Sequence, residues 1–494
     1  MSEAPDTSTS APNPRRWLAL AFIGLAQLMI VLDITVVNIA LPTAQQDLDI
    51  SDGNRQWVVT AYTLAFGSLL LLGGRIADYT GRRRAFLIGL IGFAGASALG
   101  GAAPNFETLL AARAAQGIFA ALLAPTALSL LTINFTQPKE RAKAFGVFGA
   151  IAAGGGAIGL VLGGFLTEHL DWRWCLYVNV PIAILALFSW YVLPHDERAR
   201  TGVRFDIPGV LLAVSGLVAI VYGCSEAEAD GWDSTKVIAL LVSGVTLLII
   251  FALVQGRVSQ PLLPLSIVLD RTRGSAYLAI GLAVVGMFAM FLFLTYYMQV
   301  VMSYSPVKTG LAFLPMTAAV LVSAGGISSR LIPKVAPRLL IVPGLLISGA
   351  GMAWLTQLEA TSSYVALILP AELLVGFGMG LVMAPAMNYA THGVASSEAG
   401  VAAATANTAQ QIGGSIGTAL LNTIAATAST DYLARQIVKS PQIMKQSLVE
   451  GFTESFTWGA IILVAAATIV AAMMNTPRPK PGVQSETAPA AHLG

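Results

Sequence analysis

The chain is poor in charged residues. Only 11% of its 494 residues are Asp, Glu, Lys or Arg, whereas 55% are hydrophobic, and the mean hydropathy is +0.72. Soluble domains carry about 25% charged residues, so this composition excludes an ordinary soluble protein and predicts an all-α polytopic membrane protein. The basic residues are dispersed among the segments between apolar stretches and form no concentrated patch, so we expect no nucleic-acid partner.

Metal-binding and nucleotide-binding residues are scarce as well. The two cysteines, Cys175 and Cys224, lie in apolar segments and predict neither a disulfide framework nor a metal site. The sequence has no Gly-x-x-x-x-Gly-Lys-Ser/Thr motif, which argues against an ATP-driven pump. We therefore expect no cofactor, no catalytic residues and no metal site. The four histidines, which could also bind a metal, are scattered along the sequence at His169, His195, His392 and His492.

What the chain has in abundance is long hydrophobic runs. A helix needs about 20 apolar residues to cross the hydrocarbon core of a bilayer. Fourteen segments approach or exceed this length, and the polar stretches before and after them read as disordered tails. The predicted spans are 17–41, 57–73, 85–103, 109–135, 144–166, 174–193, 207–224, 237–254, 275–301, 309–332, 339–358, 364–390, 400–425 and 456–474.

The distribution of basic residues predicts the orientation. Most of the 28 lysines and arginines fall in the tails and loops on the side of the N-terminus. The positive-inside rule then places both termini in the cytoplasm, and the even number of spans agrees with that placement.

The two halves of the chain resemble each other weakly. Arg113 precedes Pro125 in the fourth span, and Glu372 takes a comparable place before Pro385 in the second half. The same order in the same orientation predicts a parallel repeat of six spans. The predicted organisation is a tail at 1–14, a six-helix bundle at 15–200, a two-helix insert at 201–256, a six-helix bundle at 257–475 and a tail at 476–494.

Three ionisable residues stand out inside the predicted spans, namely Asp33, Arg113 and Glu372. A charge near the bilayer centre costs about 3 kcal/mol even on a lenient scale, so each needs a partner, a proton or water. Asp33 and Arg113 are either structural groups that hold helices together or a proton-coupling unit, and we interpret Asp33 as a titratable group at a water-filled cavity. Glu372 is either an interfacial glutamate that reaches the headgroups, or a second proton site or a group that attracts cationic drugs.

Several short motifs carry a more specific signal. The loop after the second span reads Gly74-Arg75-Ile76-Ala77-Asp78-Tyr79-Thr80-Gly81-Arg82-Arg83-Arg84. The fifth span has a face of small residues that suits close helix packing and sliding, Gly155, Ala157, Gly159, Gly163 and Gly164. With the stretch around Asp33 and the sequence Arg113-Ala114-Ala115-Gln116-Gly117, the chain resembles the fourteen-span drug:proton antiporter branch of the major facilitator superfamily from residue 17 to residue 474.

The resemblance implies a major facilitator fold of two six-helix bundles with two extra central helices, in a bacterial-type cytoplasmic membrane. It implies that the second loop is a conformational gate (Gly74, Asp78, Gly81, Arg82 and Arg83) and that the fifth span is the antiporter glycine motif. It places Arg113 beside a central cavity, where Gln116 contacts substrate or Arg113. Two departures stand out, Tyr79 for a basic residue and Leu160 for a proline. We assign the substrate cavity to Asn38, Gln116, Tyr296, Tyr297, Met298 and Gln410, although the aromatic and methionine run around Tyr296 also suits a lipid-facing surface.

The predicted function is therefore proton-coupled efflux of amphipathic drugs by alternating access. The partners would be small-molecule drugs, protons and the lipid bilayer, with the protein acting as a monomer and the proton gradient as the driving force. The alternative of a dedicated exporter for one endogenous metabolite or antibiotic stays open. A membrane enzyme or a sensor is disfavoured, because no nucleophile motif and no soluble domain is evident in the sequence.

Overall fold

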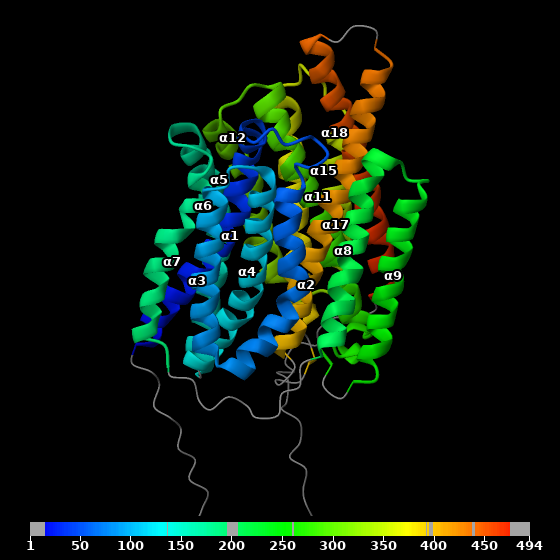
Figure 1. Ribbon diagram of the computed structural model, residues 1–494. Coiled ribbons are helices and arrows are strands. Elements are labelled where there is room, and N and C mark those ends of the chain that lie inside the picture. The colour runs from blue at the N-terminus through cyan, green and yellow to red at the C-terminus, as the bar shows by residue number, and fades with distance from the viewer. Residues whose placement is uncertain are drawn as a thin grey trace, which may run out of the picture.

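The computed structural model describes residues 15–135, 137–194, 206–258, 261–391, 393–394, 399–436 and 440–474, and within these ranges the regular structure is helical, with no strand. Most helices run side by side, as Figure 1 shows. The two predicted tails lie outside the described residues. Within the described part, thirteen helical segments are long and apolar enough to cross a membrane. The remaining predicted span, 400–425, lies in the long helix α17 (Ala399–Ala434), whose glycines, threonines and glutamines make it less apolar than the others.

The first six spans form the N-terminal bundle. Local signals set several ends: the Asn105 side chain accepts from the amide of Thr108 at the start of the fourth span, and Gly81 has φ +97° between the second and third. The sixth span is built from three short consecutive pieces. The elements are α1 (Arg16–Asp47), α2 (Trp57–Thr80), α3 (Arg82–Gly101), α4 (Phe106–Asn134), α5 (Pro138–His169), α6 (Trp174–Tyr177), α7 (Asn179–Leu187) and η1 (Phe188–Tyr191).

The last six spans form the C-terminal bundle, in which three spans contain π-helical turns. Asp270 caps the first of these spans by accepting from the amides of Thr272 and Arg273. The elements are α10 (Leu265–Val268), α11 (Arg271–Tyr296), η2 (Tyr297–Val301), α12 (Pro306–Ala312), α13 (Leu314–Leu321), η3 (Val322–Ser328), α14 (Ser329–Leu331), α15 (Arg338–Leu355), η4 (Tyr364–Ile368), α16 (Leu369–Ala390), α17 and α18 (Pro441–Met473).

Two further helices, α8 (Ile207–Asp230) and α9 (Thr235–Gln255), lie between the bundles in sequence. They pair with each other, and α8 also packs against α2 of one bundle and α17 of the other. Many side chains of α9 are exposed and apolar, so this helix faces lipid. The insert therefore covers the seam between the halves from one side (Figure 1).

The two bundles repeat each other's packing. α1 packs on α5 as α11 packs on α17, and α3 packs on α4 as α15 packs on α16. Between the halves, α5 meets α12 and α2 meets α17, which are also equivalent pairs. This is the packing expected of a parallel repeat. The exact bundle boundaries proposed from the sequence stay a prediction.

The hydrophilic stretch between the predicted spans 400–425 and 456–474 is largely helical. α17 continues to Ala434 and α18 starts at Pro441. Ser440 caps α18 by accepting from the amide of Ile443, and the hydroxyl of Ser429 donates to the carbonyl of Ser447. The hairpin that results projects beyond the rest of the bundle (Figure 1).

Candidate functional site

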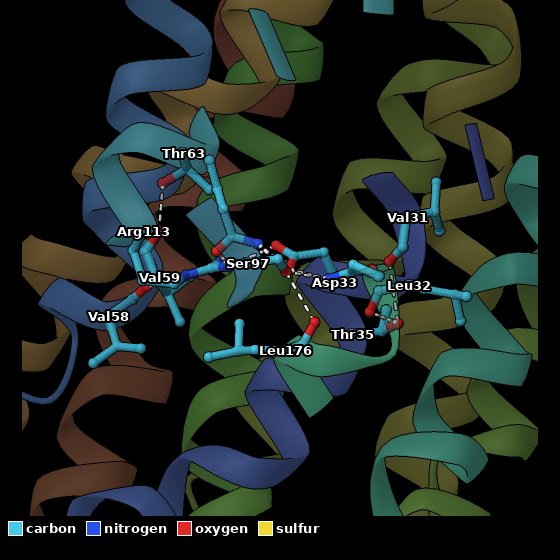
Figure 2. A network of polar contacts seen from close by, with 12 residues as sticks. Val31, Leu32, Asp33, Thr35, Val58, Val59, Thr63, Ser97, Arg113 and Leu176 are labelled. Atoms are coloured by element: carbon cyan, nitrogen blue, oxygen red, sulfur yellow. Dashed lines mark hydrogen bonds and ion pairs between the residues drawn. The ribbon is translucent and has the colours of Figure 1, made fainter. Parts of the chain in front are cut away.

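The centre of the N-terminal bundle holds a buried ion pair. Asp33 of α1 is 0% exposed and Arg113 of α4 is 1% exposed, and Arg113 Nη1 donates to Asp33 Oδ2 at 2.5 Å. Figure 2 shows the two side chains pointing toward each other, with Ser97 of α3 close to their meeting point. Two of the predicted proton-coupling residues are thus in direct contact.

Two amide side chains complete the carboxylate's hydrogen bonds. Gln116 Nε2 donates to Asp33 Oδ1 at 2.8 Å, and Asn179 Nδ2 donates to the same oxygen at 2.9 Å. Both amides also donate to Ser97 Oγ, which in turn donates to the carbonyl of Leu176 at 2.9 Å. The ionised form of Asp33 is therefore held by donors from α4 and α7, with α3 and α6 tied to them through Ser97.

The guanidinium of Arg113 is also compensated on several sides. Its Nε donates to the carbonyl of Val58 at 2.9 Å, and Nη1 donates to Gln116 Oε1 at 2.8 Å. Its Cζ lies 4.6 Å from the centre of the Tyr62 ring, within cation–π range. The pair thus forms a closed polar unit that links α1, α2, α3, α4 and the sixth span.

The complete burial of Asp33 differs from what the sequence predicts. Asp33 was expected to face a water-filled cavity, but its partners cover both carboxylate oxygens and leave no exposed surface. The sequence patterns do not identify Ser97 or Asn179 as site residues. A usable signal exists for Asn179, because an asparagine directly before Val-Pro in an apolar segment needs a buried partner.

The predicted substrate-cavity residues are spread over the molecule. Gln116 belongs to the Asp33 network, whereas Asn38 and Gln410 are half-buried on α1 and α17. Met298 is 0% exposed in the hydrophobic core, and the hydroxyl of Tyr297 donates to the carbonyl of Glu359 at 2.5 Å. These two positions lie in the π-helical turn η2, so counting along a regular helix does not place them correctly.

The outer end of the molecule, defined here as the end where α1 finishes and α2 begins, holds a second polar cluster. Arg55 is 2% exposed, donates from Nε to Asn422 Oδ1 at 3.1 Å, and places its Cζ 4.3 Å from the centre of the Tyr296 ring. Asn422 Nδ2 donates to Gln56 Oε1 at 2.8 Å, and Gln56 Nε2 donates to Ser225 Oγ at 2.6 Å. This outer cluster joins α2, α11, α17 and the insert helix α8.

A pocket of about 390 Å³ adjoins the outer cluster. Tyr296, predicted to line the substrate cavity, lies in its wall with Arg55 and Asp52, and its hydroxyl has no hydrogen-bond partner among the described residues. Other contacts between the halves lie at the same end: Glu168 Oε2 accepts from the amide of Val307, and Gln299 Nε2 donates to the carbonyl of Ile39, each at 3.0 Å. The outer end is closed in this conformation.

We expect Asn422→Ala to open the outer end, because the change removes an amide that bonds Arg55, Gln56 and the carbonyl of Asp52 across the two halves. Spin labels at positions 46 and 442, with both native cysteines replaced by alanine, should show a larger share of long distances than the parent protein. Thr427→Ala, on the same helix, is the matched control. An unchanged distance distribution would remove the outer cluster from gating.

The predicted gate loop makes contacts within the N-terminal half. Arg83 is 5% exposed, donates from Nη2 to the carbonyl of Trp190 at 2.5 Å, and has its Cζ 4.2 Å from the Trp190 ring. It therefore fastens α3 to η1. Arg75, in the same loop motif, donates to the carbonyl of Pro261 at 2.9 Å and so reaches the segment that leads into the second half.

The other predicted gate residues lie in the last part of α2, in the turn at Gly81 and at the start of α3. Gly81, with its positive φ, lets α2 end and α3 begin within one residue, and Gly74 lies opposite Pro125 on α4. Arg82 is half-buried, and the side chain of Asp78 lies outside the described residues. The expected role of Asp78 in the conformational gate stays a prediction.

The glycine motif of α5 is a contact surface. A Cβ on Gly155 would meet Leu28, one on Gly159 would collide with Thr35, and one on Gly163 would lie 2.9 Å from Val36 Cα, all on α1. Gly164 faces the other half instead: its Cβ would lie 2.5 Å from the carbonyl oxygen of Pro306. These glycines let α5 approach α1 and α12 at backbone distance.

The position that departs from the antiporter pattern lies at the same crossing. Leu160 is 1% exposed, and a Cβ on Gly310 would collide with its carbonyl. α5 runs unbroken from Pro138 to His169, as expected for a chain with leucine rather than proline at this position.

Glu372 lies in the first turn of α16 and is 0% exposed, so it does not reach the headgroups. The hydroxyl of Tyr364 lies 3.3 Å from Glu372 Oε2, and Oε1 has no partner within the described structure. It lies in the C-terminal bundle, separate from the Asp33 network. The three predicted proton-coupling residues therefore form two sites.

Comparison with known protein families identifies the family to which the chain belongs. The family model described as "Major Facilitator Superfamily" matches residues 23–418, which include Asp33, Arg113 and Glu372. The chain belongs to the Major Facilitator Superfamily.

Several superfamily members with curated names are similar over nearly the whole chain. The "Puromycin resistance protein pur8" of Streptomyces alboniger is 52% identical over 486 residues, which cover 96% of each chain. The "Cephamycin export protein CmcT" of Amycolatopsis lactamdurans is 36% identical over 97% of this chain and 96% of its own. The "Multidrug resistance protein Stp" of Mycobacterium tuberculosis is 34% identical over 84% of this chain and 76% of its own.

Solved structures agree with the superfamily fold. A bacterial homolog of the human lysosomal transporter Spinster, solved in an inward-facing and unoccupied conformation, has a TM-score of 0.65 at 17% identity and covers 94% of this chain and 98% of its own. A peptide transporter of the POT family has a TM-score of 0.65 at 16% identity, with 94% and 99% covered. The predicted major facilitator fold is confirmed.

Proposed function

We propose that this protein is a proton-coupled antiporter that exports amphipathic antibiotics across the cytoplasmic membrane by alternating access. The observation that carries the proposal is the buried Asp33–Arg113 pair, a titratable charge held at the junction of five spans. The names of the relatives, which concern puromycin and cephamycin and multidrug resistance, support the export of antibiotics.

The proposed coupling follows from the charge of Asp33. The ionised carboxylate accepts from Arg113, Gln116 and Asn179, and these bonds are charge-assisted. A proton on Asp33 removes the charge and weakens all three bonds, which loosens α1 from α4 and α7. Because α1 also packs on α5, and α5 contacts α12 of the other half, the change can reach the inter-half contact.

The proposal includes an orientation and a driving force. Both termini lie in the cytoplasm by the distribution of basic residues, so the closed outer end faces the exterior. Each proton that moves inward through 100 mV releases about 2.3 kcal/mol. The cycle needs no cofactor, its partners are drugs, protons and lipid, and a monomer contains both halves that it requires.

We expect Asp33→Asn to abolish proton-driven export while the protein stays folded, because Arg113 keeps Val58, Gln116 and the Tyr62 ring as partners. The measurement is drug uptake into inside-out proteoliposomes under an imposed proton gradient, together with proton release from purified protein when ethidium or puromycin is added. Glu107→Gln, which removes an exposed carboxylate, is the control. Full-rate uptake by the Asp33 variant would refute this coupling site.

The narrower alternative, one dedicated antibiotic, is favoured by the 52% identity to a protein named for puromycin alone. A resistance panel separates the two functions. Cells that express this protein should resist many unrelated compounds if it is a multidrug pump, and only puromycin-like compounds if it is dedicated. Resistance to none of them, with normal expression, would count against both.

A further inference from the structure

Glu372 points into the C-terminal bundle rather than toward lipid. The residues Pro370, Leu373, Leu374 and Phe377 of the same helix line an apolar groove of about 830 Å³ on the bundle surface. At 100° per residue, Glu372 lies roughly 150° around α16 from the centre of that face. Its neighbours are therefore the interior side chains, including Tyr364 of the π-helical turn η4.

The hydrogen bonds of Tyr364 indicate whether the phenol or the Glu372 carboxyl donates in the contact between them. A phenol has one O–H, and the Tyr364 oxygen lies 2.6 Å from the carbonyl oxygen of Ala312, which can only accept. The same phenol oxygen lies 3.3 Å from Glu372 Oε2. If Tyr364 donates to Ala312, the contact with Glu372 is satisfied only when the carboxyl carries a proton and donates to the phenol oxygen.

Within the part of the chain that the structure describes, the hydrogen-bond contact of the Glu372 carboxyl is an uncharged phenol. The helices that pack on α16 are α11, α13, α15, α17 and the turns η3 and η4. Among the described residues of these elements, Tyr364 is the titratable group in contact with it, and the next groups outward are Tyr304 and Lys308, whose Nζ lies 3.6 Å from the Tyr304 ring. Burying an isolated carboxylate is costly, whereas Asp33 has a guanidinium at 2.5 Å. Asp33 is thus paired with a cation, whereas Glu372 is in contact with an uncharged phenol.

We propose that Glu372 is a second proton-carrying group, which takes a proton from the exterior and carries it in the conformation described here. The inference rests on the proposed proton-coupled export and adds a stoichiometry of two protons per drug molecule, one through each half. Half-buried Tyr364, with the exposed residues of the 356–363 segment beside it, is the route by which the carboxyl reaches the outer surface. Proton transfer returns Glu372 to a carboxylate only when the halves move and water or a cationic drug reaches it.

Infrared difference spectroscopy tests the charge state without any need for transport. The C=O stretch of a protonated carboxyl should be present in the wild type at neutral pH and lost in Glu372→Gln. Glu359→Gln, which changes an exposed carboxylate at the same end, should leave that band in place. A wild-type spectrum with no band that depends on Glu372 would overturn the proposal.

The accumulation ratio tests the stoichiometry. Proteoliposomes with one pH unit across the membrane, and the voltage clamped at zero with potassium and valinomycin, concentrate a drug by about tenfold for each coupled proton, hence about 100-fold for two. We expect about 100-fold for the wild type and about tenfold for Glu372→Gln. Equal ratios would refute the role of Glu372, whereas a wild type that concentrates no drug would refute the proposed function itself.

Discussion

Replacing Arg113 by methionine is expected to destabilise the protein by about 3 to 5 kcal/mol, one of the largest effects that a single substitution can have here. The change leaves the Asp33 carboxylate fully buried with only Gln116 and Asn179 as donors. It also leaves the carbonyl of Val58 without its donor. Thermal unfolding in detergent, followed by intrinsic fluorescence, measures the loss.

The matched control for this substitution is the double variant Asp33→Asn with Arg113→Met. Removing both charges takes away the uncompensated carboxylate, so most of the stability should return. Drug accumulation should stay abolished, since the proposed coupling group is absent. A double variant that is as unstable as Arg113→Met alone would show that packing of the guanidinium, not its charge, is what the fold needs.

The second large effect is expected from Gly164→Ala. Its new Cβ would lie 2.5 Å from the carbonyl oxygen of Pro306 and 2.7 Å from Val307 Cα, and both are backbone atoms that cannot rotate away. Overpacking of this kind costs about 1 to 3 kcal/mol. Because the contact crosses between the halves, the cost falls on the closed outer end and not on either bundle. We expect transport to fall by about tenfold or more, since 1.4 kcal/mol is a tenfold change in population.

Gly156→Ala, on the same helix, is the control. A Cβ at Gly156 would meet no neighbouring atom within 4 Å among the described residues. It should transport normally. Spin labels at positions 46 and 442 should report an opened outer end in Gly164→Ala and a closed one in Gly156→Ala. If Gly164→Ala transports at the parental rate, the α5–α12 contact is not part of the cycle.

Much of the fold follows from the sequence because lipid imposes simple rules. Apolar length predicts the spans, including the one at 400–425. The helix there, α17, is longer than predicted, with 36 residues, and has a more polar composition than the other spans. The contact between Asp33 and Arg113 is also predictable, since both charges need a partner in an apolar medium.

The parts that sequence patterns do not predict depend on geometry between distant helices. Arg55 reads as an ordinary loop charge, yet its guanidinium is buried against Asn422, which is far away in the chain. Tyr297 and Met298 are assigned to the substrate cavity from the sequence, but both lie in the π-helical turn that starts at Tyr297 and are buried in the structure. The enclosure of Asp33 depends on Ser97 and Asn179, two small polar residues whose hydrogen bonds around Asp33 join helices far apart in the sequence.

The insert helix α8 forms hydrogen bonds with both halves at the outer end of the molecule. The hydroxyl of Ser225 accepts from Gln56, the residue directly before α2, and the carbonyl of Cys224 accepts from Thr423 of α17 at 2.8 Å. When the outer end opens, α8 has to give up one of these bonds or move with both partners, and α9, which lies in lipid, has to follow it. Acyl chains must then rearrange during every cycle, so the thickness and fluidity of the membrane become part of the energy barrier to drug release.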